Sequence, residues 1–176
     1  MTENGMQVRT GVHGGIPNAE QFSLLFELSR SFNAFIDLDE LLPHVATQTR
    51  NVLQAESCAI LLVEENQQEN RQELFFAVIS DVDPAVERRL KKLRFPADHG
   101  IVGWVVQQGE PALVTDVSND KRFYRGVDQQ SGANTRDLLC APLRTRHSVI
   151  GALELRNKQV DRFTKEDLLF LDALAG

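Results

Sequence analysis

The chain has 176 residues, of which 42% are hydrophobic and 25% are charged, and its formal net charge is −6. This size and composition are typical of one globular domain with a substantial core. The negative charge argues against binding to a nucleic-acid backbone, which requires a basic surface. No apolar run reaches the roughly 20 residues of a membrane span, and the first 17 residues lack the apolar core of a signal peptide, so we expect a cytoplasmic location.

Two helices are expected near the start of the chain. Residues 1–17 are polar and rich in glycine, which predicts a disordered leader. From residue 18 onward, apolar side chains recur at three- and four-residue steps, which predicts a helix. They are Phe22, Leu25, Leu28, Phe32 and Phe35. Asp37 and Glu40 form a capping-box pattern for a second helix, and Pro43 should disturb that helix early because proline lacks an amide hydrogen.

Strands are expected in the next part of the chain. Residues 57–64 and 73–80 are rich in apolar and β-branched residues, and the polar stretch 65–72 between them is typical of a hairpin loop. Basic residues are interleaved with apolar ones over 84–92, which indicates a solvated face. A third, short strand is expected near 93–96.

Glycines mark a short helix in the middle of the chain. Gly100 and Gly103 bracket its start and Gly109 ends it. A short strand is expected over 111–117. Residues 119–135 are then polar, contain glycine and are long for a plain connection, so they are predicted to form a functional lid.

The last third of the chain predicts two strands and a helix. Residues 137–144 and 148–157 are the strands, and Thr164 caps the helix. This helix is still apolar at Gly176, from which we expect that it continues into another domain. Strands grouped together with helices at both ends indicate an α+β fold rather than alternating βαβ units.

The two cysteines, Cys58 and Cys140, lie inside apolar strand-like runs. Reduced, buried thiols are favoured over a catalytic thiol, a disulfide or a cofactor attachment point. Two cysteines without histidines at matching spacing do not form a four-ligand zinc site, and no Ser-His-Asp order appears. We therefore expect neither a metal nor catalysis.

Several motifs occur in a family-like order: FPADHGIVGWV, GEP, FYRGVD, TRDLLCAPL, IGALELRNK and FTKEDL. They resemble the GAF family of small-molecule sensor domains, and are most similar to the type that binds cyclic nucleotides in phosphodiesterases and some adenylyl cyclases. The resemblance covers roughly residues 20–175 and implies a GAF domain over 18–176. It also implies a central antiparallel sheet of about six strands, with terminal helices on one face and a lidded pocket on the other.

The resemblance implies a ligand site with no required cofactor and with cAMP or cGMP as the ligand. In cyclic-nucleotide binders the backbone amides at the positions of Ile101 and Val102 meet the cyclic phosphate, and free amides at a helix N-terminus independently favour an anion. Tyr124 and Asp128 belong to the part of the lid that closes over the base and sugar. The other polar pocket positions are Ser131, Thr135 and Glu154.

The same resemblance identifies a structural motif. Its residues are Asn157, Lys158, Phe163 and Asp167, and in the family its Lys–Asp pair is an internal salt bridge that supports the fold. Two positions depart from the family pattern. Ala59 stands where cyclic-nucleotide binders often have serine, and Leu168 stands where the motif ends in glutamate.

These features predict an N-terminal regulatory, small-molecule-sensing domain of a larger signalling or transcription-regulatory protein. A sigma-N-dependent AAA+ activator, a histidine kinase and a cyclase are the expected hosts, with an output domain beyond residue 176. Wide apolar faces on the terminal helices predict a homodimer. The alternative is a ligand-free dimerisation or protein-interaction module. Some stand-alone GAF proteins reduce free methionine sulfoxide with a set of cysteines, but no partner thiol lies in this lid.

Overall fold

The computed structural model describes residues 20, 23–24 and 37–176. The predicted leader and the apolar stripe of the predicted first helix lie outside these residues. The helices are α2 (Leu38–Val52), α3 (Pro84–Leu90), α4 (Gly100–Gln108), α5 (Gly126–Ser131) and α6 (Lys165–Ala175), with a 3-10 turn at Val117–Asn119. The strands are β1 (Ala55–Asn66), β2 (Arg71–Asp81), β3 (Arg94–Pro96), β4 (Ala112–Val114), β5 (Leu138–Arg144) and β6 (Val149–Lys158).

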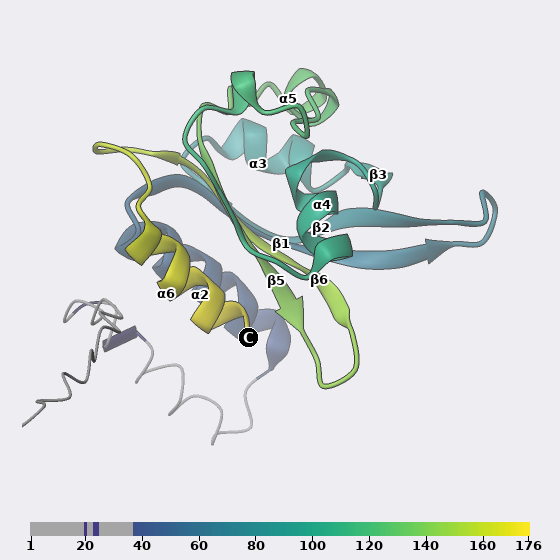
Figure 1. Ribbon diagram of the computed structural model, residues 1–176, viewed down its shortest axis with the longest axis horizontal. Coiled ribbons are helices and arrows are strands. Elements are labelled where there is room, and N and C mark those ends of the chain that lie inside the picture. The colour runs from purple at the N-terminus through teal and green to yellow at the C-terminus, as the bar shows by residue number, and fades with distance from the viewer. Residues whose placement is uncertain (1–19, 21–22, 25–36) are drawn as a thin grey trace, which may run out of the picture.

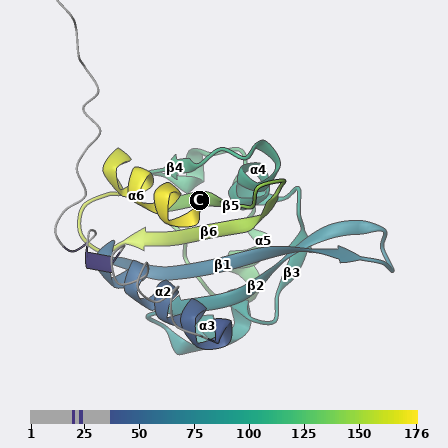
Figure 2. The same ribbon diagram turned by 90° about the horizontal axis from the view of Figure 1, so that it is seen from below.

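The strands form one six-stranded sheet in the order β3-β2-β1-β6-β5-β4, and every neighbouring pair is antiparallel. Helices α2 and α6 cover one face of this sheet, while α3, α4 and α5 lie on the other face (Figures 1 and 2). The predicted α+β architecture is therefore confirmed. No helix among the described residues is long and apolar enough to cross a membrane.

Side chains alternate between two separate cores because successive residues of a strand point to opposite faces. On β1, Cys58 and Ile60 belong to the core beneath α2 and α6, which we call the helix-face core. Ala59 and Leu61 belong to the core beneath α4 and the lid, which we call the pocket-face core. Both faces are covered, so the central strands are apolar almost throughout.

Helix α2 passes through Pro43, so the predicted early disturbance was wrong. An interior proline removes one helical hydrogen bond, but burial of residues such as Leu41 and Ala46 against β1 and β2 offsets that loss. Asp37 caps the helix by accepting from the amide of Asp39 at 3.1 Å. Among the described residues, Glu40 makes no reciprocal contact, so the predicted capping box does not form.

The hairpin between β1 and β2 is longer than predicted. The strands continue to Asn66 and Arg71, which leaves only residues 67–70 for the turn. The Asn66 side chain organises this turn by accepting from the amides of Gln68 and Glu69. The hairpin projects from the body of the domain (Figure 1), and its residues are polar because no core covers them there.

Two short helices were not predicted. Residues 84–90 form α3, which starts at Pro84 behind the cap Asp83 and buries Val86 and Leu90. The lid contains α5, which ends at Gly132 with a φ of 78°, a conformation that favours glycine. Both helices have seven residues or fewer, so neither shows a full helical stripe in the sequence.

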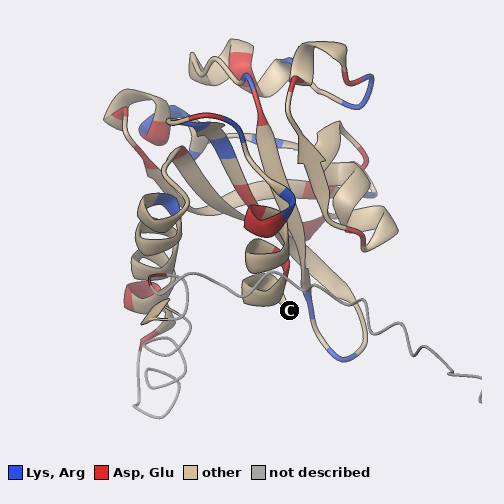
Figure 3. Ribbon diagram, turned by 60° about the vertical axis from the view of Figure 1, so that its left-hand side comes forward, with Lys and Arg blue, Asp and Glu red and all other residues tan. Residues whose placement is uncertain are grey.

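The predicted ends of α4 and α6 are confirmed. Gly109 ends α4 in the left-handed conformation, with a φ of 67°. Thr164 caps α6 and forms a complete capping box with Asp167. Acidic and basic residues are interspersed over helices, strands and loops (Figure 3).

Candidate functional site

A cavity of about 40 Å³ lies between the sheet, the start of α4 and the lid. Its apolar wall comes from β1, β2, β3 and the lid, and includes Phe76, Phe95, Phe123 and Tyr124. Its polar lining consists of Asp128, Thr135, Glu154 and Arg156. The cavity therefore has an aromatic side and a charged side, which is the usual composition of a small-molecule site.

Tyr124 closes the cavity over the start of α4. Its ring lies 6.1 Å from that of Phe95 and makes an edge contact at 5.2 Å with that of His99. A side chain at Gly126 would clash with the Tyr124 ring, because a Cβ there would lie 2.4 Å from it. Any side chain at residue 126 would therefore require the Tyr124 ring to shift.

The start of α4 presents backbone amides beside the cavity. Gly103 has the first amide of α4 that donates to a preceding carbonyl among the described residues, and its acceptor is His99 O at 3.2 Å. The amides of Gly100, Ile101 and Val102 precede that bond, and such groups favour an anion. Ile101 lines the cavity, whereas Val102 is buried in the pocket-face core and does not line it.

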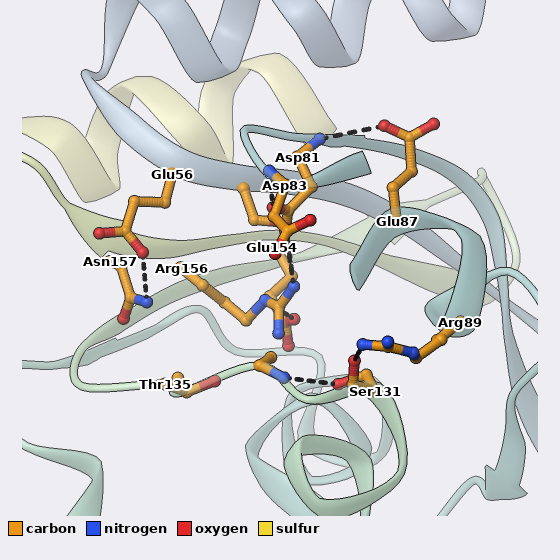
Figure 4. Close-up of polar contacts among 12 residues, drawn as sticks. Glu56, Asp81, Asp83, Glu87, Arg89, Ser131, Thr135, Glu154, Arg156 and Asn157 are labelled. Atoms are coloured by element: carbon orange, nitrogen blue, oxygen red, sulfur yellow. Dashed lines mark hydrogen bonds and ion pairs between the residues drawn. The ribbon is translucent and has the colours of Figure 1, made fainter. Parts of the chain in front are cut away.

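The charged side of the cavity is formed by Glu154 and Arg156 of β6 together with Asp128 of α5, and we call these residues the polar floor. The Arg156 Nη2 donates to Ser57 Oγ at 3.0 Å and to Asp81 Oδ2 at 3.3 Å. Its Nη1 lies 3.9 Å from Asp128 Oδ1, and its Nε lies 3.7 Å from Glu154 Oε1. Figure 4 shows Arg156 beside Asp81 of β2 and Glu154 of β6.

The pKa of Glu154 is raised to about 7, chiefly by burial and to a smaller extent by the nearby charge of Asp128. The Arg156 guanidinium opposes this shift but lies too far away for a hydrogen bond to the carboxylate. Glu154 therefore changes its protonation state near neutral pH. A perturbed carboxyl in a cavity is a feature of functional sites.

Asp128 and Thr135 are bonded to each other across the lid. Thr135 donates its amide to Asp128 Oδ2 at 2.7 Å and its hydroxyl to Asp128 Oδ1 at 2.8 Å. The Thr135 hydroxyl was expected to donate a hydrogen bond to a ligand, but it donates to Asp128 instead. The pair closes the lid into a compact loop whose inner surface faces the cavity.

Ser131 lies outside the cavity although it was predicted to line it. Its side chain is fully buried and accepts from the amide of Ala133 at 3.2 Å, and its carbonyl accepts from Arg89 of α3 at 3.1 Å. Of the predicted ligand-binding residues, the cavity brings together the following: Ile101, Tyr124, Asp128, Thr135 and Glu154. Ser131 and Val102 instead support the surrounding backbone and core.

Arg156 was missed by the sequence analysis. A signal for it was present, because residues two apart in a strand share a face, so Arg156 had to lie on the same side of the sheet as Glu154. Its strand context, ELRNK, looked like part of the structural motif instead. Arg156 also lines a second, more polar cavity of about 170 Å³ at the ends of β1 and β2, so its side chain separates the two cavities.

The structural motif lies beside the lid rather than in the cavity. Asn157 has a φ of 59° and fastens the end of the lid, because its side chain accepts from the amide of Arg136 and donates to the carbonyl of Asn134. Lys158 pairs with Asp167 at 3.1 Å, and Phe163 is buried in the helix-face core.

The two thiols lie on opposite faces of the sheet. Cys58 belongs to the helix-face core and Cys140 to the pocket-face core, and both are fully buried. Burial raises the pKa of each thiol well above its usual value, which disfavours the reactive thiolate. Within the described ranges, no group of three or more His, Cys, Asp or Glu side chains is arranged to hold a metal ion.

Comparison with known proteins places these observations in a family. A model of the GAF domain matches residues 37–176. A probable 3',5'-cyclic phosphodiesterase of Caenorhabditis elegans is 27% identical over 165 residues, which are 89% of this chain and 22% of that protein. The chain thus spans about a fifth of this relative's length.

Solved structures share the fold. The GAF domain of a phosphoenolpyruvate-protein phosphotransferase from Coxiella burnetii has a TM-score of 0.72 at 18% identity, covering 89% of this chain and 88% of that one. A free methionine-R-sulfoxide reductase from Neisseria meningitidis, solved with its substrate, has a TM-score of 0.70 at 18% identity, covering 94% and 90%. One fold therefore occurs in proteins with different named activities.

Proposed function

The chain belongs to the GAF domain family, and from that premise we propose that it is a regulatory domain that senses a small molecule in the cavity beneath the lid. The observation that carries this proposal is the convergence of an aromatic wall, free helix amides and the polar floor on one cavity. Ligand contacts with the lid would alter how the lid packs on the sheet. This change in lid packing would be transmitted through the sheet to a neighbouring domain.

We propose an anionic ligand with a planar ring, and a cyclic nucleotide as the first candidate. The phosphate would meet the amide of Ile101 at the start of α4, and the ring would lie against Phe95 and Tyr124. Asp128 would meet the base, positioned by its bonds to Thr135. The similarity to a cyclic phosphodiesterase supports this choice.

The size of the cavity sets a condition on this proposal. Small-molecule sites usually have volumes of roughly 300–1,000 Å³, whereas this cavity has about 40 Å³. A nucleotide therefore enters only when the lid moves outward. The hollow on the outer surface of the lid shares Phe123, Asp128 and Thr135 with the cavity, so this side is the expected entrance.

Calorimetry with cAMP and with cGMP on the purified, nucleotide-free domain tests the proposal. We expect saturable heat and a thermal shift with at least one of them. Absence of both effects at millimolar ligand would refute the cyclic-nucleotide assignment. Native mass spectrometry of the freshly purified protein would then show whether another small molecule copurifies.

The small cavity favours one alternative, a ligand-free dimerisation or protein-interaction module. In that case the aromatic wall would serve only as core, and the lid would remain closed. The two functions differ in a direct observable, because only the sensor has a small molecule that protects the amides of the lid from hydrogen exchange.

We further propose that the domain regulates an output domain in a larger cytoplasmic signalling or transcription-regulatory protein, such as a sigma-N-dependent activator, a histidine kinase or a cyclase. The similarity to part of a longer phosphodiesterase supports a multidomain context. We propose no catalytic role for the chain. The burial of Cys58 and Cys140 and the raised pKa of each thiol support this view.

A further inference from the structure

The polar floor contains a buried donor that has no hydrogen-bond partner in the described part of the chain, and a buried carboxylate beside it. Arg156 is 95% buried by side-chain area, and its Nε has no hydrogen-bond partner among the described residues. The Glu154 side chain is 91% buried, and its Oε1 lies at ion-pair distance from this Nε without a hydrogen bond between them. Leaving such groups unpaired is costly, and each one requires an explanation.

The unpaired donor and the carboxylate lie next to each other. Arg156 Nε and Glu154 Oε1 are 3.7 Å apart, which is too long for a hydrogen bond but close to the spacing of two contacts along one edge of a ligand. Both residues line the cavity of the proposed site. They come from one strand, so their relative position is fixed by the sheet.

The other contacts of Arg156 hold the guanidinium in place. Nη2 is bonded to Ser57 on β1 and to Asp81 on β2, and the Asp81 carboxylate also accepts from the amide of Asp83 at 2.8 Å. These bonds use neither Nε nor its hydrogen, and Nε is buried.

We propose that Arg156 contacts the ligand directly and, together with Glu154, recognises a planar edge that carries a hydrogen-bond acceptor beside an N–H donor, as a lactam or amide does. The acceptor receives the hydrogen of Arg156 Nε, and the N–H donates to the Glu154 carboxylate. This inference rests on the proposed small-molecule site but names a specificity-determining residue outside the positions that the family resemblance marks.

The chemistry disfavours some ligands. A ligand edge that carries only hydrogen-bond acceptors would place an oxygen or ring nitrogen against Glu154. When Glu154 is ionised, repulsion between these two acceptors disfavours that pairing. An apolar ring would leave both groups unpaired and buried. A lactam edge satisfies both groups at once, because its carbonyl oxygen and its N–H are adjacent and lie in one plane.

The test follows the Arg156 Nε–H signal by NMR of the ¹⁵N-labelled protein, assigned by its loss in Arg156→Lys. The probes are cGMP, 2-pyridone and N-methyl-2-pyridone. The last retains the carbonyl of 2-pyridone but lacks its N–H. We expect cGMP and 2-pyridone to shift the signal, and N-methyl-2-pyridone to bind at least about tenfold more weakly than 2-pyridone.

A variant of Glu154 gives a second readout that does not depend on how well Arg156→Lys folds. Glu154→Met fills a similar volume without an acceptor and should weaken cGMP and 2-pyridone binding by about tenfold, with little effect on N-methyl-2-pyridone. Glu110→Met, at an exposed position, is the matched control and should bind all three probes like the wild type.

The outcomes separate this inference from the proposed function. If cGMP binds but leaves the Arg156 signal and the Glu154→Met affinity unchanged, the inference is wrong and the sensor function stands. If cGMP does not bind but 2-pyridone shifts the signal, the inference stands and the nucleotide assignment falls. If no probe moves the signal, the unpaired groups are bridged by water only and the inference is overturned.

Discussion

Lys158 Nζ lies 3.1 Å from Asp167 Oδ2, and this ion pair joins the end of β6 to the first turn of α6. Both side chains are 12% exposed. The same Asp167 oxygen accepts from the amide of Thr164, so one carboxylate both caps α6 and anchors it to the sheet. Lys158 also lies over the ring of Phe163, with Nζ 5.5 Å from its centre.

A double-mutant cycle should detect this coupling. Lys158→Ala is expected to lower the free energy of unfolding by about 2–3 kcal/mol, because it leaves a mostly buried carboxylate without its cation. Asp167→Ala should cost more, since it also removes the cap. Urea unfolding of both single variants and the double variant should give a coupling energy of about 1 kcal/mol or more. Strictly additive losses would show that the pair contributes nothing.

Glu154 should make stability depend on pH. Its folded-state pKa of about 7 is above its ordinary value of 4.5, so its contribution to stability is fully present below pH 4.5 and is lost as pH rises toward 7. The difference corresponds to roughly 3 kcal/mol. Glu154→Gln cannot ionise, so its stability relative to the wild type should increase between these pH values and stay constant above them. A difference that does not change with pH would contradict the raised pKa.

Thr135 is expected to act on the ligand by positioning Asp128. Thr135→Val removes the hydroxyl that donates to Asp128 but keeps the shape of the side chain. We expect about tenfold weaker ligand binding, as for the loss of one hydrogen bond to a charged group. Thr135→Ser retains the hydroxyl and is the control. Calorimetry with cGMP measures both, and equal affinities of Val and Ser variants would show that the hydroxyl is not needed.

Arg89 should hold the lid against α3. Its guanidinium donates to Ser131 O at the end of α5, while the neighbouring Arg88 is exposed and has no such contact among the described residues. Arg89→Ala is expected to speed hydrogen exchange of lid amides between Tyr124 and Thr135 by several-fold, because the last turn of α5 loses its anchor. Amides of β1 and β5 should be unaffected.

The control for Arg89 is Arg88→Ala, which removes the same charge one residue away. Trp104 gives an independent readout, because it is the chain's single tryptophan and Arg122 of the lid lies 4.4 Å from the centre of its ring. If the lid amides exchange at the same rate in both arginine variants and Trp104 fluorescence is the same in both, Arg89 does not fasten the lid.

The terminal helices should mediate self-association. Leu169 of α6 is 58% exposed on the same face of the sheet as α2, which leaves an apolar side chain without cover in the described part of the chain. Leu169→Glu is expected to shift light scattering toward the monomer at tens of micromolar, a rough range for weak interfaces. Ile150→Glu, at another exposed apolar position, is the control. A wild-type monomer under these conditions would refute the prediction.

The sequence alone determined those features that depend on neighbouring residues. Thr164 with Asp167 specified the start of α6, and Gly109 specified the end of α4, because caps are local hydrogen-bonding and conformational requirements. Apolar runs located the central strands, and the GAF-like motifs predicted the α+β fold and five cavity residues. Pro43 misled the prediction because tertiary burial of α2 outweighs a local propensity.

Only the tertiary structure decided what surrounds each polar group. Arg156 is 99 residues from Ser57 and 75 from Asp81, and no local pattern indicates that these side chains meet. Likewise, Thr135 was expected to donate to a ligand, but the fold of the lid directs its hydroxyl to Asp128. The cavity, the pKa of Glu154 and the unpaired Arg156 Nε all result from long-range packing, because burial and strand register exist only once the sheet has formed.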